Sequence, residues 1–182
     1  LAQDINSLAG KILRVTDDGK PAPDNPFNTR VYSYGHRNPQ GIAWDNKGKL
    51  WATEHGGKGT DELNLIEPGK NYGWPIIRGD QEHEGMINPI INSGIDIWAP
   101  AGAAYVNNSI FFGGLRGEGL YEVPIGEEPV RIIQHFKNEF GRIRDVIVGP
   151  DGMLYLTTSN RDMKGIPEAT DDRIIRVNPN RL

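Results

Sequence analysis

The sequence predicts an all-β fold made of short antiparallel strands, and three features of the chain support this prediction. The 182 residues include 23 Gly and 13 Pro, a composition typical of many strands joined by tight turns rather than of a helix bundle. Apolar and polar residues alternate over short segments, which is the two-residue period of a half-buried strand. Several of these segments meet at an Asn, Asp or Lys residue followed by Gly, which is typical of a β-hairpin.

A repeated hairpin predicts the architecture. Segments 41–54 and 145–158 run parallel, since in each an alternating strand leads through a Lys-Gly or Asp-Gly turn into a second strand. A third apolar strand follows each copy, at Glu62–Ile66 and at Arg173–Val177. A weaker copy lies between them, with expected strands at 103–106, 110–112, 119–123 and 130–135. The outer copies are two units of about 50 residues apart, which is close to the four-stranded blade of a β-propeller.

The repeat divides the chain into about three blades of one partial β-propeller domain, residues 1–182. Residues 1–40 are expected to hold the end of a preceding blade, with a strand at Lys11–Val15, and a connecting loop. The blades are expected at about 41–100, 101–140 and 141–182. A propeller closes with about four to eight blades, so we expect an incomplete ring or a missing partner fragment. A β-sandwich is the alternative, and the fixed strand order of the repeat argues against it.

Net charge and residue types exclude some classes of function. The chain has 20 Lys and Arg against 24 Asp and Glu, a formal net charge of −4, which argues against binding to a nucleic-acid backbone. It has no cysteine, and no apolar run approaches the ~20 residues that a transmembrane helix needs. It opens at Leu1 with neither a Met nor a signal peptide, so we expect a mature or cut terminus. This charge is compatible with a small neutral or acidic ligand.

The segment Gly35–Gly41 is the first candidate binding site. It presents Arg37 and Asn38 at the start of an expected strand, near the loops where a propeller displays its binding face. A guanidinium is a planar fork and the neighbouring amide adds a donor and an acceptor, so the pair suits carboxylate or carbonyl groups on a flat ligand. A turn with a surface arginine is the alternative interpretation.

The segment Glu54–Glu62 is a candidate cation site. It combines three carboxylates with backbone carbonyls made accessible by Gly56 and Gly57. Calcium takes six to eight oxygen ligands, many of them carbonyls, and the spacing here does not match an EF-hand, so such a site would be irregular. Gly and Asp are also ordinary loop residues, which is the alternative. Zinc is disfavoured because His55 has no partner at metal-ligand spacing.

Two arginines mark the start of a later strand. Strand alternation puts Arg142 and Arg144 on one face, whereas Ile143 points to the other. Two guanidiniums side by side repel each other unless an anion or an acidic residue lies between them. The pair therefore predicts either an anionic ligand or pairing with Asp145 or Glu139.

Five segments considered together point to a family. They are Gly35–Gly41, Asp61–Ile66, Asn71–Pro75, Arg142–Asp145 and Pro150–Gly152. Their order and spacing resemble the glucose/sorbosone dehydrogenases, the soluble PQQ-dependent aldose sugar dehydrogenases, over nearly the whole chain. The opening segment Asn6–Arg14 is also similar to a mid-chain segment of this family. The resemblance implies the C-terminal half of a six-bladed β-propeller that binds the quinone cofactor PQQ and calcium.

The resemblance also implies which residues hold the cofactor. Arg37 and Asn38 match the pair that contacts PQQ, and Arg142 and Arg144 match the arginines that pair with its carboxylates. Arg116 stands where relatives usually carry Lys, which keeps the charge and changes the reach. The implied cofactor-binding set is Arg37, Asn38, Gly114, Leu115, Arg116, Arg142, Ile143 and Arg144.

The same resemblance implies two calcium sites. Gly56 and Gly57 match the positions whose carbonyls hold the calcium of the cofactor, although Gly57 stands where the glucose dehydrogenase branch has a Pro. Glu62 and the carbonyl of Tyr72 match a second, structural calcium site.

The activity implied by the resemblance is oxidation of an aldose to its lactone. A hydride would pass from C1 of the sugar to the quinone, calcium would act as a Lewis acid, and a histidine base would take the hydroxyl proton. That base is expected upstream of this segment, since none of the four histidines (His36, His55, His83 and His135) matches its position. The chain alone is therefore expected not to turn over. An external electron acceptor, the missing N-terminal half of the propeller and a periplasmic or extracellular location are also implied.

Two other functions are compatible with a propeller. A calcium-dependent lactonase-type hydrolase would have little use for both Arg142 and Arg144 aimed at one cavity. A noncatalytic binding propeller is disfavoured by the presence of Arg37 and Asn38 together with that pair.

Overall fold

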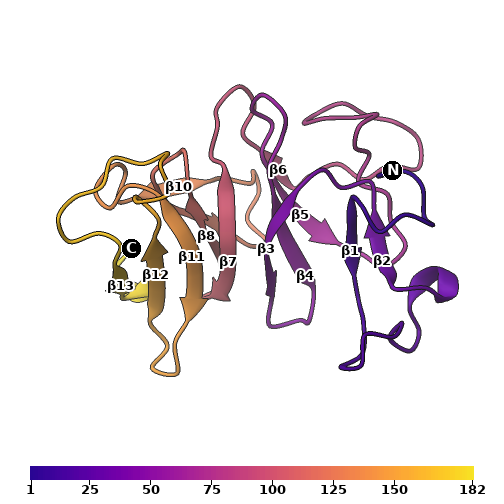
Figure 1. Ribbon diagram of the computed structural model, residues 1–182, viewed down its shortest axis with the longest axis horizontal. Helices are drawn as coiled ribbons and strands as arrows, with labels where there is room; N and C mark the ends of the chain where they lie inside the picture. Colours follow the sequence, from indigo (N-terminus) through magenta and orange to yellow (C-terminus); the bar gives the residue numbers. More distant parts are fainter.

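A computed structural model describes residues 1–182 as thirteen strands with no α-helix (Figure 1). The strands are β1 (Lys11–Leu13), β2 (Val31–Tyr34), β3 (Pro39–Trp44), β4 (Leu50–Glu54), β5 (Glu62–Ile66), β6 (Ile91–Asn92), β7 (Pro100–Val106), β8 (Ser109–Gly114), β9 (Gly119–Pro124), β10 (Ile133–His135), β11 (Ile143–Val148), β12 (Leu154–Thr158) and β13 (Ile174–Val177). Two short 3-10 turns, Pro26–Asn28 and Pro179–Arg181, complete the regular structure. No helix long and apolar enough to cross a bilayer is found.

The strands form antiparallel sheets that follow one another along the chain. The first full sheet has the order β3-β4-β5-β6, the second β7-β8-β9-β10 and the third β11-β12-β13, while β1 and β2 form a two-stranded sheet. Figure 1 shows these sheets side by side in chain order, with the two termini toward opposite ends of the molecule. The first strands of the three sheets are neighbours, since β7 packs against both β3 and β11. The predicted propeller architecture is confirmed, with three sheets as blades.

Side chains of neighbouring blades interlock to form the core. One cluster joins the first two blades, where Trp51 and Leu63 meet Phe112 and Tyr121. A second cluster joins the next two, where Phe111 packs with residues of β11 and β12. Each fully buried side chain of this size stabilises the fold by about 1.5–3 kcal/mol. Consecutive blades are therefore held in fixed positions, and so are the loops at their strand ends.

Some strands were missed or shorter than expected. The expected strand at Lys11–Val15 ends at Leu13 and pairs with β2, a strand in the region interpreted as a connecting loop. The expected strand 130–135 begins only at Ile133, since only Ile133–His135 pairs with β9. The two-residue strand β6 carries too little pattern to be found from sequence.

Candidate functional site

A cavity of about 670 Å³ opens where loops of all three blades meet. Its lining residues are Arg37, Asn38, His55, Gly56, Gly57, Gly59, Asp61, Ile97, Ala99, Leu115, Arg116, Arg142, Arg144, Asp162 and Lys164. Eight of the residues singled out from the sequence therefore meet in one place, although they lie up to 107 positions apart, from Arg37 to Arg144. This volume falls within the range of small-molecule sites, about 300–1,000 Å³.

Four predicted residues lie beside this cavity rather than on its wall. Gly114 ends β8, and the side chain of Ile143 is fully buried in the core between blades. Glu62 and Tyr72 line a much smaller neighbouring pocket of about 10 Å³, which shares Arg37 and Gly56 with the large cavity.

The wall of the cavity carries an excess of positive charge. Its cations are Arg37, Arg116, Arg142, Arg144 and Lys164, and its acidic residues are Asp61 and Asp162. Clustered cations in a concave, partly desolvated site raise the local concentration of anions and bind carboxylates through charge-assisted hydrogen bonds. The cavity is therefore suited to a small ligand with several negative groups.

Asp162 lies between the two arginines of β11. Its Oδ2 accepts from Nη2 of Arg142 at 2.7 Å and from Nη2 of Arg144 at 3.1 Å. Hydrogen bonding from Arg142 lowers the pKa of Asp162 to about 2. The alternative of pairing with Asp145 or Glu139 is wrong, because Asp162 is the acidic partner of both arginines and Asp145 accepts from the backbone N–H of Val146.

Arg142 also forms a hydrogen bond with the adjacent blade. Its Nη1 donates to the carbonyl of Leu115 at 2.8 Å, and its side chain is almost completely buried. Arg144 is more exposed and bonds only to Asp162. The two arginines thus differ in role, since Arg142 connects the second blade to the third and Arg144 is freer to meet a ligand.

Asp61 holds two loops of the cavity wall. Its Oδ1 accepts from the backbone N–H of Gly56 at 2.8 Å, and its Oδ2 accepts from that of Ala99 at 2.7 Å. A Cβ at Gly56 would overlap the carbonyl oxygens of Gly59 and Thr60, so only glycine fits there. The loop that carries Gly56 and Gly57 is therefore tightly held at the cavity wall.

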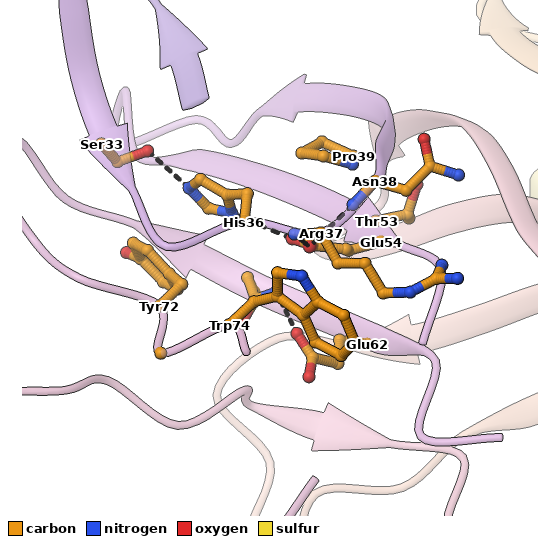
Figure 2. Close-up of polar contacts among 12 residues, drawn as sticks. Ser33, His36, Arg37, Asn38, Pro39, Thr53, Glu54, Glu62, Tyr72 and Trp74 are labelled. Carbon is orange, nitrogen blue, oxygen red and sulfur yellow. Dashed lines mark hydrogen bonds and ion pairs between the residues drawn. The ribbon is translucent and has the colours of Figure 1, made fainter. Parts of the chain in front are cut away.

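The side chain of Arg37 lies across the first blade (Figure 2). Its Nη1 donates to the carbonyl of His55 at 3.1 Å, and its guanidinium carbon lies 5.4 Å from the centre of the Trp74 ring. Arg78 approaches the same ring at 4.7 Å. Such cation–π contacts orient a guanidinium and leave its other donors available.

A buried chain of polar side chains runs from Ser33 through His36 to Glu54, beside Arg37 and Asn38 (Figure 2). Nε2 of His36 lies 2.8 Å from Oγ of Ser33, and its Nδ1 lies 2.9 Å from Oε2 of Glu54. The other oxygen of Glu54 accepts from the backbone N–H groups of both Arg37 and Asn38. Glu54 was predicted as one of three carboxylates of a cation site and His36 was given no role, because nothing local predicts that residues 18 positions apart form a hydrogen bond.

The small pocket beside Arg37 contains a buried glutamate. Burial raises the pKa of Glu62 to about 7, although Nδ2 of Asn64 donates to its Oε2 at 3.0 Å. Oδ1 of Asn64 is itself buried without a hydrogen-bond partner. Hard cations such as calcium bind to oxygen atoms, and here an unpaired amide oxygen lies next to a buried carboxyl. No group of three or more His, Cys, Asp or Glu side chains is gathered anywhere in the chain, so a bound metal would need backbone carbonyls as well.

The four histidines occupy different environments. Only His55 lines the large cavity, and its Nε2 donates to the carbonyl of Pro100 at 2.7 Å. His36 is fully buried, and His83 is exposed in a loop. His135 pairs with Glu122 at 2.8 Å on outer strands of the second blade.

The sequence matches the family model described as "Glucose / Sorbosone dehydrogenase" over residues 1–166. Among curated proteins, it is 35% identical to the aldose sugar dehydrogenase YliI of Escherichia coli, covering 86% of this chain and 50% of that protein. It is 45% identical to quinoprotein glucose dehydrogenase B of Acinetobacter calcoaceticus over 46% of this chain and 18% of that protein.

Solved structures agree with these matches. The PQQ-bound aldose sugar dehydrogenase of Streptomyces coelicolor superposes with a TM-score of 0.92 at 45% identity, over 98% of this chain and 54% of that one. The apo-form of the soluble aldose sugar dehydrogenase of Escherichia coli superposes with a TM-score of 0.82 at 31% identity, over 98% and 57%. The chain thus spans about half the length of the aldose sugar dehydrogenases that it matches.

Proposed function

Because this chain belongs to the glucose/sorbosone dehydrogenase family, we propose that it forms the C-terminal part of the cofactor site of a PQQ- and calcium-dependent aldose dehydrogenase. The observation that carries this proposal is the convergence of Arg37, Asn38, Arg142 and Arg144 on one cavity. A solved relative binds PQQ, which supports the choice of ligand.

The chemistry of the cavity fits PQQ. This cofactor is a planar quinone that carries several carboxylates, and the cavity wall offers four guanidiniums and one ammonium group. Arginine forks bind carboxylates in a bidentate manner, whereas an amide such as that of Asn38 suits a carbonyl or ring nitrogen. We assign Arg116, Arg142 and Arg144 to the carboxylates, with Gly114, Leu115 and Ile143 as neighbouring backbone, and Arg37 and Asn38 to the quinone side.

Two positions fit calcium. The first is the loop held by Asp61, where the carbonyls of Gly56 and Gly57 would be ligands next to the cofactor. The second is the small pocket, where Glu62 and the carbonyl of Tyr72 would be ligands. The unpaired Oδ1 of Asn64 lies beside this second position and supports a cation there.

The chemistry expected of the bound groups is hydride acceptance by the quinone, with calcium as a Lewis acid. The residues of this chain would bind and orient the cofactor. The arginines would fix its carboxylates, and the cation–π contact with Trp74 keeps the Arg37 guanidinium near the cavity. None of these residues is proposed as the base. Three histidines lie off the cavity wall, and the Nε2 of His55 is engaged by Pro100. The base is therefore proposed to lie outside these 182 residues, as are the sugar-binding residues that complete the site.

The proposed partners are an aldose sugar, an external electron acceptor and the other half of the propeller. By the likeness to this family we also propose a periplasmic or extracellular location. Immunoblotting of periplasmic and cytoplasmic fractions tests that location, and recovery in the cytoplasm alone would contradict it.

The proposed function is tested by titrating PQQ into the full-length protein with and without calcium, followed by an aldose-dependent dye-reduction assay. We expect saturable PQQ binding that strengthens with calcium, and dye reduction only when an aldose is added. Intact mass spectrometry of the sample establishes which length of chain is present. A folded full-length protein that binds no PQQ would contradict the proposal.

A further inference from the structure

Glu54 is a buried carboxylate that holds three donors at once. It is the last residue of β4, and it is only 3% exposed. Its Oε1 accepts from the backbone N–H groups of Arg37 and Asn38, the second at 3.0 Å, and its Oε2 accepts from Nδ1 of His36 at 2.9 Å. Removing a buried charge from water is costly unless its hydrogen bonds are satisfied, so this arrangement needs all three donors.

The directions of these hydrogen bonds follow once Glu54 is taken as ionised and His36 as neutral. Backbone N–H groups can only donate, so Oε1 of Glu54 acts as an acceptor for both. A carboxylate at Oε2 requires that Nδ1 of His36 carry a proton, and a neutral imidazole then accepts at Nε2 from the hydroxyl of Ser33. His36 is also stacked on Tyr72, with ring centres 4.7 Å apart, which fixes the plane of the imidazole. With Glu54 ionised and His36 neutral, each hydrogen bond between Ser33, His36 and Glu54 has one direction.

The hydrogen-bonded side chains end at the backbone of two residues that line the large cavity, Arg37 and Asn38. Glu54 lines only the small pocket, and Ser33 and His36 line neither. Glu54 holds these residues by their backbone and leaves both side chains free to face a ligand (Figure 2). We propose that Glu54 and His36 are positioning residues, which set the backbone of Arg37 and Asn38 in the geometry that binds the cofactor. This inference rests on the proposed function for the identity of the ligand.

The test uses two substitutions at one position in the full-length protein. Glu54→Gln keeps Oε1 as an acceptor for both backbone groups. Its Nε2 can donate to Nδ1 of His36 when the imidazole adopts the other tautomer, which then donates to Ser33. Glu54→Leu has a similar volume and removes every acceptor. Leu156→Ala is the stability control, because Leu156 is fully buried in the core between the second and third blades, away from this chain.

Two readouts separate positioning from general destabilisation. The first is hydrogen exchange at the backbone amides of Arg37 and Asn38, measured without ligand. The second is the dissociation constant of PQQ, measured at a temperature where circular dichroism shows each variant folded. Glu54→Leu is expected to speed exchange at both amides at least tenfold and to weaken PQQ binding by about 10- to 100-fold, the usual effect of losing a residue that orients a ligand-binding group. Glu54→Gln is expected to stay within about threefold of the wild type in both.

The outcomes are distinct. Leu156→Ala should lower the unfolding midpoint and leave both local readouts unchanged. Equal effects of Glu54→Gln and Glu54→Leu would show that charge rather than hydrogen-bond geometry matters, and would overturn the inference. Unchanged amide exchange in Glu54→Leu would overturn it as well. A wild-type protein that binds no PQQ while Glu54→Leu still loosens the two amides would refute the proposed function and leave the positioning role standing.

Discussion

Nη2 of Arg142 lies 2.7 Å from Oδ2 of Asp162, on a loop 20 residues further along the chain. Asp162 reduces the repulsion between Arg142 and the neighbouring Arg144, which donates to the same oxygen at 3.1 Å. The acidic residue thereby keeps two cations together on the cavity wall before any ligand arrives.

This pairing predicts a pH dependence of stability. The pKa of Asp162 falls to about 2, chiefly through hydrogen bonding from Arg142, so its stabilisation is present above its ordinary pKa near 4 and is lost as pH falls toward 2. We expect Asp162→Asn to be less stable than the wild type by a constant amount above about pH 5, and the difference to shrink below pH 4. Urea unfolding at several pH values measures it. A difference independent of pH down to pH 2.5 would show that Asp162 acts through something other than its charge.

Gly56 and Gly57 make a matched pair, because they are adjacent and differ in the space around them. A Cβ at Gly56 would overlap the carbonyls of Gly59 and Thr60, whereas at Gly57 the nearest atom is Nη1 of Arg78 at 3.9 Å. We expect Gly56→Ala to cost about 1–3 kcal/mol in the free energy of unfolding and to weaken calcium-dependent PQQ binding. Gly57→Ala should be within about 0.5 kcal/mol of the wild type. Thermal unfolding of both variants checks this, and equal destabilisation would contradict the loop geometry.

Arg144 is predicted to bind the anionic ligand directly. Its side chain is 43% exposed and contacts only Asp162, so Arg144→Ala removes little structure. The loss of one charged hydrogen bond should weaken PQQ binding by about tenfold or more and reduce its sensitivity to salt. Arg131→Ala is the control, since Arg131 pairs with Glu127 on the surface and lies off the cavity wall. If both variants bind PQQ as the wild type does, Arg144 is not a ligand residue.

Substitutions of Arg116 test whether this cavity residue binds the ligand through its charge. It lines the cavity and makes no side-chain hydrogen bond to the protein, so its guanidinium is available to a ligand. We expect Arg116→Lys to retain PQQ affinity within about threefold, because an ammonium group still meets a carboxylate, whereas Arg116→Ala loses about tenfold. Fluorescence titration of PQQ distinguishes them. Identical affinity of the Ala variant and the wild type would remove Arg116 from the proposed set.

Local patterns predicted much of the fold. Strand alternation and the turn at Asp151-Gly152 are properties of neighbouring residues, so the hairpin of β11 and β12 was readable from sequence. Arg37, Asn38, Arg142 and Arg144 were chosen as candidates because they are polar residues at strand ends, where a propeller gathers its loops, and all four line the cavity.

The supporting residues could not be found in this way. In the sequence, Glu54 is one of three carboxylates in a glycine-rich segment, and Asp162 is one acidic residue in a polar loop. Their roles depend on which blade packs beside which, and that is set by the burial of Phe111, Phe112 and their neighbours. Long-range hydrogen bonds of this kind leave no periodic signal in the sequence.

Glu62 gives the last prediction, and its sign is opposite to that of Asp162. Burial raises its pKa to about 7, so in the metal-free protein the carboxyl is readily accommodated when protonated and costs stability when ionised. Its contribution is therefore most favourable below its ordinary pKa of about 4.5 and is lost as pH rises through about 7. Glu62→Gln should match the wild type at pH 5 and exceed it by about 2–3 kcal/mol at pH 8. Glu82 is exposed, so Glu82→Gln should not gain stability over the wild type between pH 5 and pH 8.

Calcium should reverse the order of stability of the wild type and Glu62→Gln at pH 8, because a cation bound by Glu62 favours the ionised carboxyl. At pH 8 we expect added calcium to raise the unfolding midpoint of the wild type and of Glu82→Gln by similar amounts, since a ligand that binds only the folded state stabilises it. Glu62→Gln should lose most of that increase, because a neutral amide is a weaker ligand for a hard cation than a carboxylate. Differential scanning fluorimetry with calcium and with chelator makes the comparison. An equal calcium response in all three proteins would place the cation elsewhere and leave Glu62 as a buried carboxyl whose cost the fold tolerates.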